Sequence, residues 1–416
     1  MASSEGNAPE PASRKKRILF VAEAVTLAHV ARAVALSETL DRTSYEVHLA
    51  HHPRYRKLLG DVQAREHAIE SISPERFNAA LARGAPLYDV VTLKHYVEAE
   101  RELIANIRPD VVVGDFRISL AVSAELAGVP CITIGNACWS PYTHQRYIAP
   151  DLPLTRALGS TVGQALFTLA RPLAFAAHCW PMHRLRRHYG LPGLGFDLRR
   201  VYSHGDFTLY ADLPDLYVTR ELPDNHRFIG PVLFSTRGAL PDWWESLPVD
   251  RPAVYVTPGS SGSSAMLPTI LDALGDMDLS VMLATAGAQL TTPVPDNIYT
   301  AAFLPGAAAA ARADLVVCNG GSPTTHQALA CGKPVLGIAG NMDQFLNMQT
   351  LARAGAGLCL RADALSPSRL RAGMQTMLAT QSFALRAAEL ARQISNCDGA
   401  ANFRTFLQVL ETRPEP

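Results

Sequence analysis

The chain has 416 residues, of which 48% are hydrophobic and 18% are charged, so it is long enough for two Rossmann-sized cores. Lys plus Arg and Asp plus Glu each number 38, and this balance argues against a protein that attracts nucleic acid through its overall charge. The seven cysteines are scattered without paired spacing, which indicates reduced thiols in a cytoplasmic protein rather than a zinc site or a disulfide framework.

The first sixteen residues, MASSEGNAPEPASRKK, are polar and rich in Pro and Ser, and they contain no apolar core. This composition predicts a disordered tail and not a signal peptide.

Strands and helices then alternate over residues 17–211. The segments are RILFVAEA, HVARAVALSETL and YEVHLAHH, followed by DVVVGDF, SLAVSAELAG and PCITIGN. This order predicts an α/β domain. The longest apolar stretch, Ala165–Ala177, is interrupted by Arg171 and Pro172 and is too short to span a bilayer. It predicts a pair of buried or interfacial helices, and a peripheral, membrane-facing patch remains open.

The periodicity fades over residues 212–250, where a Pro-rich run predicts a linker between domains. A second α/β alternation occupies residues 251–397, with AVYVTPGSSG, SVMLATAG, DLVVCNGG and PVLGIAG as its main strand segments. Residues 398–410 have a helical pattern.

Residues 303–347 carry the clearest functional signal. The apolar run LVVC predicts a buried parallel strand that stops at Asn319-Gly320-Gly321, and a helix opens at Ser322. Glycines let a backbone approach a ligand closely, and a helix start offers free N–H groups to a phosphate. The pattern therefore predicts a diphosphate cradle, although glycines that serve only to turn the chain are the structural alternative.

Polar side chains also follow the next strand, PVLGIAG, where Asn341 to Asn347 read NMDQFLN. The order NGG, T, ALACGKPVL, DQFLN resembles the donor-binding segment of the family-1 inverting glycosyltransferases of the macrolide and UDP-glycosyltransferase type, which read HGG, S or T, EALAAGVPVV, DQPLN. The resemblance implies the GT-B fold, with two Rossmann-like α/β/α domains facing across a cleft. It also implies a nucleotide-sugar donor, and a final helix, residues 398–416, that packs back on the first domain.

The resemblance assigns donor roles to twelve residues. Phe303 would stack on the nucleobase, Thr324 would bind phosphate, and Asp343 with Gln344 would hydrogen-bond the sugar hydroxyls. The ordinary alternatives are a core phenylalanine, a helix cap and a solvated turn. The complete predicted set is Gly259, Ser260, Ser261, Phe303, Asn319, Gly320, Gly321, Ser322, Thr324, Gln327, Asp343 and Gln344.

Two positions depart from the family pattern. Asn319 stands where the family usually has His, and Gln327 stands where it usually has Glu. An Asn amide still donates one hydrogen bond to phosphate, whereas Gln offers ribose hydroxyls only a neutral oxygen. The donor nucleotide, UDP or dTDP, is therefore left open.

The acceptor side falls in the first domain. His29 precedes a helix at the position of the family's catalytic base, although the flanking GHxxP pattern is incomplete, and Asp115 ends a strand at the position of the Asp that orients it. A loop histidine and a helix cap are the alternatives. Phe116, Trp139 and Tyr142 are predicted to line an apolar acceptor pocket, or else to be core residues. His326 is expected on a helix surface.

These features together predict an inverting hexosyltransferase that moves a sugar from a nucleotide to a hydroxyl of a small, largely apolar acceptor, a natural product or a lipid. No metal is expected, because no Asp-x-Asp pair follows a strand end. The alternatives are a non-catalytic homologue that binds nucleotide or activates a partner transferase, and a lipid-directed N-acetylglucosaminyl transferase or sugar-nucleotide epimerase. A monomer and a homodimer fit the sequence equally well.

Overall fold

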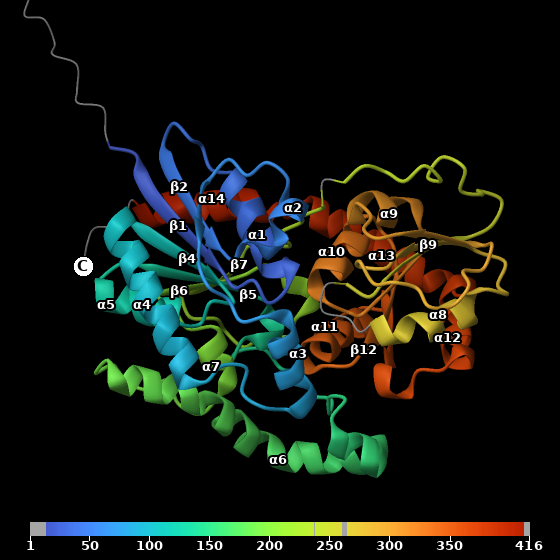
Figure 1. Cartoon of the computed structure of the whole chain (residues 1–416), viewed down its shortest axis with the longest axis horizontal. Coiled ribbons are helices and arrows are strands. Elements are labelled where there is room, and N and C mark those ends of the chain that lie inside the picture. The colour runs from blue at the N-terminus through green and yellow to red at the C-terminus, as the bar shows by residue number, and fades with distance from the viewer. Residues whose placement is uncertain (1–13, 237, 260–263, 412–416) are drawn as a thin grey trace, which may run out of the picture.

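Two parallel sheets, one in each half of the chain, organise the computed structural model, which describes residues 14–236, 238–259 and 264–411 (Figure 1). The first sheet has the strand order β3-β2-β1-β4-β5-β6-β7, and the second has the order β10-β9-β8-β11-β12-β13. In both sheets the strand order reverses beside the first strand of the half, which is where such sheets bind ligands. The predicted α/β class with two Rossmann-like domains is confirmed. Most of the predicted tail, residues 1–13, lies outside the described residues.

The strands of the first sheet are β1 (Lys16–Ala22), β2 (Tyr45–His51), β3 (Arg65–Ala68), β4 (Val111–Asp115), β5 (Cys131–Gly135), β6 (Phe207–Tyr210) and β7 (His226–Phe228). Those of the second sheet are β8 (Ala253–Thr257), β9 (Ser280–Ala284), β10 (Ile298–Ala301), β11 (Leu315–Cys318), β12 (Val335–Ala339) and β13 (Gly357–Arg361). The central strands are apolar on both faces because helices cover both sides of each sheet.

The helices of the first half are α1 (Leu27–Glu38), α2 (Arg56–Leu59), α3 (Pro74–Arg83), α4 (Val90–Ile107), α5 (Leu120–Ala127), α6 (Pro153–His188) and α7 (Leu198–Tyr202). Those of the second half are α8 (Leu267–Leu274), α9 (Gly306–Arg312), α10 (Ser322–Ala330), α11 (Met342–Arg353), α12 (Pro367–Ala379), α13 (Gln381–Ser395) and α14 (Gly399–Glu411). None of the helices in the described ranges is both long and apolar enough to cross a bilayer.

The register of the central strands aligns their carboxyl ends. Ala22 of β1 pairs with Asp115 of β4, and Thr257 of β8 pairs with Cys318 of β11. The loops that follow these strands therefore open together at one edge of each sheet. These loops carry most of the candidate site.

Helix α14 returns from the second half to the first sheet (Figure 1). Phe403 is fully buried beside Phe20 of β1, with ring centroids 5.9 Å apart, and Phe406 packs on Phe207 at 5.3 Å. The last five residues of the predicted helix, 412–416, lie outside the described part of the chain.

The region expected as a linker, residues 212–250, contains part of the first domain. Strand β7 lies in it and pairs in parallel with β6, so the first sheet extends beyond Ala211. Its prolines mark the turns on either side of this short strand rather than one continuous connection.

Helix α6 also differs from its expected form. The structure has one helical element of 36 residues, interrupted at Gly159, where φ is 73°. The predicted pair of helices over Ala165–Ala177 is therefore wrong, because this stretch lies within one helix. Many of the apolar side chains of α6 are exposed, which contradicts the buried form of the prediction but not the interfacial one. The helix runs along the outside of the molecule and contacts α4 and α7 (Figure 1).

Candidate active site

A cavity of about 1200 Å³ lies between the two domains and receives residues from both. The first domain contributes side chains of α1, α3 and α6, and the loops after β4 and β5. The second contributes the loops after β8, β9, β10, β11 and β12. A cavity at the carboxyl ends of two doubly wound sheets is where this architecture places a ligand.

The structure brings His29 and Asp115 together. His29 lies in the first turn of α1, and its Nδ1 is 2.9 Å from Oδ1 of Asp115, the last residue of β4. The imidazole side chain is 19% exposed and lines the cavity, whereas Asp115 is buried. Because Nδ1 faces the carboxylate, Nε2 is the ring nitrogen left to exchange a proton in the cavity.

Arg32, which the sequence analysis missed, completes this pair. Its Nε donates to Oδ2 of Asp115 at 2.6 Å and its Nη2 donates to Oδ1 at 2.8 Å. Burial by itself would raise the pKa of Asp115, but the charge and hydrogen bonds of Arg32, aided by His29, hold it below the usual value. The carboxylate therefore stays ionised beside the imidazole. The spacing i, i+3 from His29 on one helix was the available signal.

Phe116 packs against His29 of this pair. Its ring stacks on the imidazole of His29, with centroids 4.7 Å apart and planes 13° apart. Its φ is +52°, a conformation that is uncommon for a bulky residue. The turn thus places Asp115 and Phe116 on adjacent sides of one imidazole.

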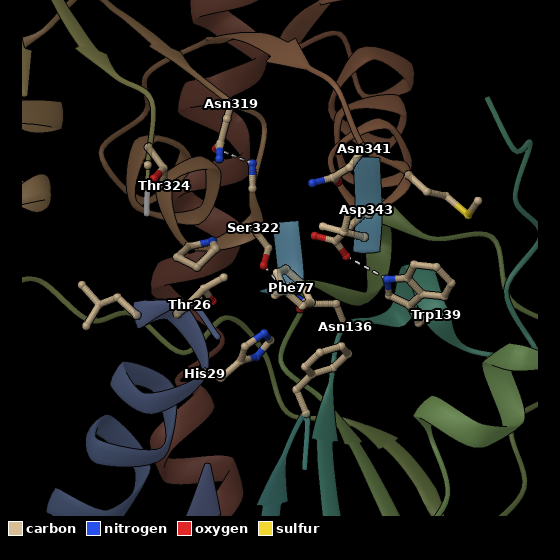
Figure 2. Close-up of a pocket in the computed structure, with 18 of the residues that line it drawn as sticks. Thr26, His29, Phe77, Asn136, Trp139, Asn319, Ser322, Thr324, Asn341 and Asp343 are labelled. Carbon is tan, nitrogen blue, oxygen red and sulfur yellow. Dashed lines mark hydrogen bonds between the residues drawn. The ribbon is translucent and has the colours of Figure 1, made fainter. Parts of the chain in front are cut away.

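A chain of hydrogen bonds joins the two domains at the cavity floor. Nη1 of Arg32 donates to Oδ1 of Asn136 at 3.1 Å, and the same oxygen accepts from Oγ of Ser322 at 3.3 Å (Figure 2). Asn136 in turn donates to Asp212 at 3.1 Å. His326 faces Asp212 at 3.3 Å and is buried, so its expected place on the helix surface was wrong. Helix α10 packs against the first domain on the side that carries His326.

The glycine loop after β11 contains a turn that only glycine fits, at Gly320. Gly320 has φ +81°, and a Cβ there would lie 2.6 Å from Cγ of Met348. Asn319 is buried, and its Oδ1 accepts the backbone N–H of Gly321 at 3.1 Å. The side chain of Asn319 thus fixes the loop at the start of α10, in addition to any ligand contact.

Asn347, the last residue of DQFLN, is buried and ties this loop to α11. Its Nδ2 donates to the carbonyl of Gly320 at 2.8 Å and to Oγ1 of Thr325 at 2.9 Å. Its role is to hold the loop, and only the three-dimensional structure reveals it.

The two predicted sugar-binding residues of α11 have different environments. Oδ1 of Asp343 accepts from Nε1 of Trp139 at 2.8 Å across the cleft, and both side chains line the cavity (Figure 2). Gln344 does not line the cavity and is buried. Its Oε1 accepts from the backbone N–H of Gly340 at 2.9 Å, and its backbone N–H donates to Oδ1 of Asn341. This reciprocal capping box commits the oxygen of Gln344 to the helix start.

The remaining donor residues occupy the far wall. Phe303 is 45% exposed and lines the cavity, so its flat face is available to a base. Gly259, Ser322 and Thr324 also line it. Asn319 and Gly321 line it as well, whereas Gly320 does not. Ser260 and Ser261 lie outside the described residues.

Gln327 lines the cavity, but its amide is already engaged. Its Nε2 donates to the carbonyl of Phe234, and its Oε1 lies against Gly306, where a Cβ would collide with it. In this structure the amide of Gln327 is therefore not free to make the expected contact with a ribose. An amide is needed here because only an N–H can face the Phe234 carbonyl.

Gln327→Glu is accordingly expected to destabilise the fold by about 1–3 kcal/mol, since it turns a donor into an acceptor facing a carbonyl. Gln327→Met, which removes the hydrogen bond without adding charge, should cost less. Thermal unfolding and UDP affinity of both variants check this. A Gln327→Glu protein that is as stable as wild type and binds UDP about tenfold tighter would instead support a ribose contact.

On the acceptor side, Phe116 and Trp139 line the cavity as predicted, but Tyr142 does not. Tyr142 packs edge-on against His226, with ring centroids 5.1 Å apart. The sequence missed Phe77 and Tyr202, which line the cavity and contact Phe116 at 6.3 and 5.5 Å between centroids. The rings of α3, of α7 and of the loops after β4 and β5 thus form one aromatic wall near His29.

Within the described ranges, no three His, Cys, Asp or Glu side chains converge to form a metal site. The cavity offers instead backbone N–H groups, hydroxyls and the His29–Asp115–Arg32 cluster.

Comparison with known proteins gives a consistent picture. Residues 268–398 match the family described as erythromycin biosynthesis protein CIII-like, C-terminal domain. A PGL/p-HBAD biosynthesis rhamnosyltransferase of Mycobacterium bovis (strain BCG / Pasteur 1173P2) is 50% identical over 384 residues, 92% of this chain and 85% of the relative. A PGL/p-HBAD biosynthesis glycosyltransferase of Mycobacterium tuberculosis (strain ATCC 25177 / H37Ra) is 50% identical over 405 residues, 97% of this chain and 94% of the relative.

A similar fold is found in the spinosyn rhamnosyltransferase SpnG complexed with thymidine diphosphate, with a TM-score of 0.68 at 20% identity, covering 94% of this chain and 100% of that one. The matches to the two mycobacterial proteins cover 92 and 97% of this chain and therefore include both domains. The chain is a glycosyltransferase of the family-1 type with the GT-B fold, and it belongs to the family of the PGL/p-HBAD biosynthesis glycosyltransferases.

Proposed function

We propose that the enzyme transfers a sugar, with inversion, from a thymidine or uridine diphosphate to a hydroxyl of an apolar acceptor held beside His29. The single observation that carries the proposal is that His29, paired with Asp115, and the glycine-loop residues Asn319 and Gly321 line the same cavity. A base on one wall and an anion cradle on the other suit a single displacement at a carbon between them.

In this mechanism, Nε2 of His29 takes the proton of the acceptor hydroxyl as its oxygen bonds to the anomeric carbon. The bond from that carbon to the diphosphate breaks on the opposite face, and the diphosphate leaves with the electron pair. Asp115 stabilises the imidazolium that forms, because its carboxylate faces Nδ1 at 2.9 Å. The developing negative charge would be met by N–H groups at the start of α10 and by the hydroxyls of Ser322 and Thr324.

The donor would lie against the second domain. Phe303 offers a face to the base, and Asp343 offers an acceptor to sugar hydroxyls. Trp139 already donates to Asp343, so the sugar would share this carboxylate with the first domain. This shared contact would couple donor binding to the acceptor side of the cleft.

The acceptor would lie in the first domain. Phe77, Phe116, Trp139 and Tyr202 surround the entrance to His29, and apolar residues of α6 extend the wall outward. An acceptor with an aromatic ring or alkyl chain would bury its apolar part there, at about 25 cal/mol for each Å² removed from water.

The donor proposal predicts a definite nucleotide response. Because the amide of Gln327 is held by Phe234, no charged group at that position favours a ribose 2′-hydroxyl. We therefore expect UDP and dTDP to bind within about tenfold of each other, and GDP to bind more weakly. A thermal-shift series with the three nucleotides, followed by transfer assays with UDP- and dTDP-sugars, including dTDP-rhamnose, tests this. A hundredfold preference for UDP, or no stabilisation by any nucleotide, contradicts it.

A further inference from the structure

Helix α6 presents a row of exposed apolar side chains, here called the apolar row. Val162, Leu166, Leu169 and Leu173 follow at intervals of four, three and four residues, and Trp180 lies seven further on. Their exposed fractions are 52, 42, 80, 77 and 51%. At 3.6 residues per turn these positions share one face of a helix. A contiguous exposed row of this kind marks an interaction surface.

The apolar row is continuous with the cavity. Leu166, Leu169 and Leu173 belong to the row and also line the cavity, so the apolar wall near His29 runs outward to the surface of α6. The helix lies along the outer edge of the first domain (Figure 1). An apolar molecule could therefore pass between this outer surface and the cavity along one apolar wall.

The charge of α6 complements an anionic surface. The helix, Pro153–His188, contains no Asp or Glu. Arg184, Arg187 and His188 are exposed near its C-terminal end, beyond the apolar row. Arg156, at the other end, is already paired with Asp151 at 2.5 Å. Exposed leucines flanked by exposed arginines on one long helix are typical of a helix that lies in the headgroup region of a bilayer.

We propose that the apolar row of α6 docks on an anionic lipid bilayer. The side chains of Leu169 and Leu173 enter the boundary between headgroups and acyl chains, and Arg184 and Arg187 meet the lipid phosphates. The cavity then opens toward the bilayer, where apolar acceptors partition. Docking goes beyond sugar transfer and is measured without it, so either can fail while the other stands.

Co-sedimentation of the full chain with vesicles tests the proposal. We expect binding to vesicles of phosphatidylcholine with phosphatidylglycerol, weaker binding to phosphatidylcholine alone, and weaker binding at high salt. Leu169→Asp combined with Leu173→Asp should weaken binding at least about tenfold. Val162→Asp, which lies outside the cavity lining, should also weaken it. Replacing Arg184 and Arg187 by Gln should lower the affinity for the anionic vesicles about fivefold for each arginine, and should leave the affinity for phosphatidylcholine vesicles unchanged.

Val249→Asp is the matched control, because Val249 is 89% exposed and lies outside α6. It should bind vesicles as wild type does, and thermal unfolding should show every variant folded. The proposal is overturned if wild type ignores anionic vesicles or if the Leu169 and Leu173 double variant binds them unchanged. It is also overturned if light scattering without lipid shows a dimer that Val162→Asp dissociates, since a second copy would then cover the row.

Discussion

His29→Ala is expected to slow sugar transfer by about a hundred- to ten-thousand-fold while nucleotide affinity stays close to wild type. The imidazole of His29 lines the cavity, and its Nδ1 contacts Asp115, which leaves Nε2 to accept a proton. The substitution therefore removes the proton acceptor. The glycine loop and Phe303 belong to the other domain and remain in place. Initial rates and nucleotide titrations of the same preparation separate the two effects.

His95→Ala is a suitable control, because His95 is exposed on α4 and outside the cavity lining. Asp115→Asn should reduce the rate less than His29→Ala, since the base remains while the charge that orients it is lost. Transfer by His29→Ala within a few-fold of wild type would rule out His29 as the base.

Arg117→Met is expected to destabilise the fold by about 3–5 kcal/mol, because it leaves two buried carboxylates without a counter-charge. Arg117 is fully buried, and it donates to Glu23 at 2.9 Å and to Glu100 at 2.6 Å. It directly follows Phe116, so this network also supports the turn that carries Asp115. Arg76→Met, at an exposed pair with Asp89, should cost only about 0–1 kcal/mol.

The loss in Arg117→Met should depend on pH in a definite direction. Burial already raises the pKa of Glu23, even though the charge of Arg117 lowers it. Without Arg117 the folded state holds a proton that the unfolded state releases above its ordinary pKa, so stability rises as the pH falls. Denaturant unfolding at pH 5 and pH 8 should show the larger deficit at pH 8. An equal deficit at both values would mean that the carboxylates find other partners.

The strand and loop order around the site could be predicted because it depends on local patterns. Buried apolar runs ending in Asn319-Gly320-Gly321 and in Gly340 identify strand ends, and parallel strands bring their ends to one edge. His29 lies in the first turn of the helix that follows β1 and Asp115 ends the neighbouring strand β4, and the structure brings them into contact.

Side-chain partners across the chain could not be predicted in this way. Gln344 and Gln327 were expected to contact the donor. Instead, the side-chain oxygen of Gln344 accepts from the backbone N–H of Gly340, and the side-chain N–H of Gln327 donates to the carbonyl of Phe234. His326 was expected at a surface that the first domain in fact covers, where Asp212 meets it. In each case the deciding group is a backbone or a side chain that no sequence spacing indicates.

Helix α6 shows a different kind of limit. Apolar residues predict burial in a globular protein, yet Leu169 and Leu173 are mostly exposed. Periodicity identifies the face of a helix, but only the tertiary structure shows whether another element covers that face. Strand β7 was missed for a related reason, since three residues between turns give too short a pattern.

Single displacement between the two domains is the central claim, and the configuration of the product tests it most directly. Proton NMR of a transfer reaction with a sugar nucleotide of known anomeric configuration and an apolar alcohol or phenol gives that configuration. The account predicts a product inverted at the anomeric carbon, formed about a hundred- to ten-thousand-fold more slowly by His29→Ala than by wild type. A product that retains the donor configuration would contradict it, because the acceptor oxygen would then not have attacked opposite the leaving diphosphate.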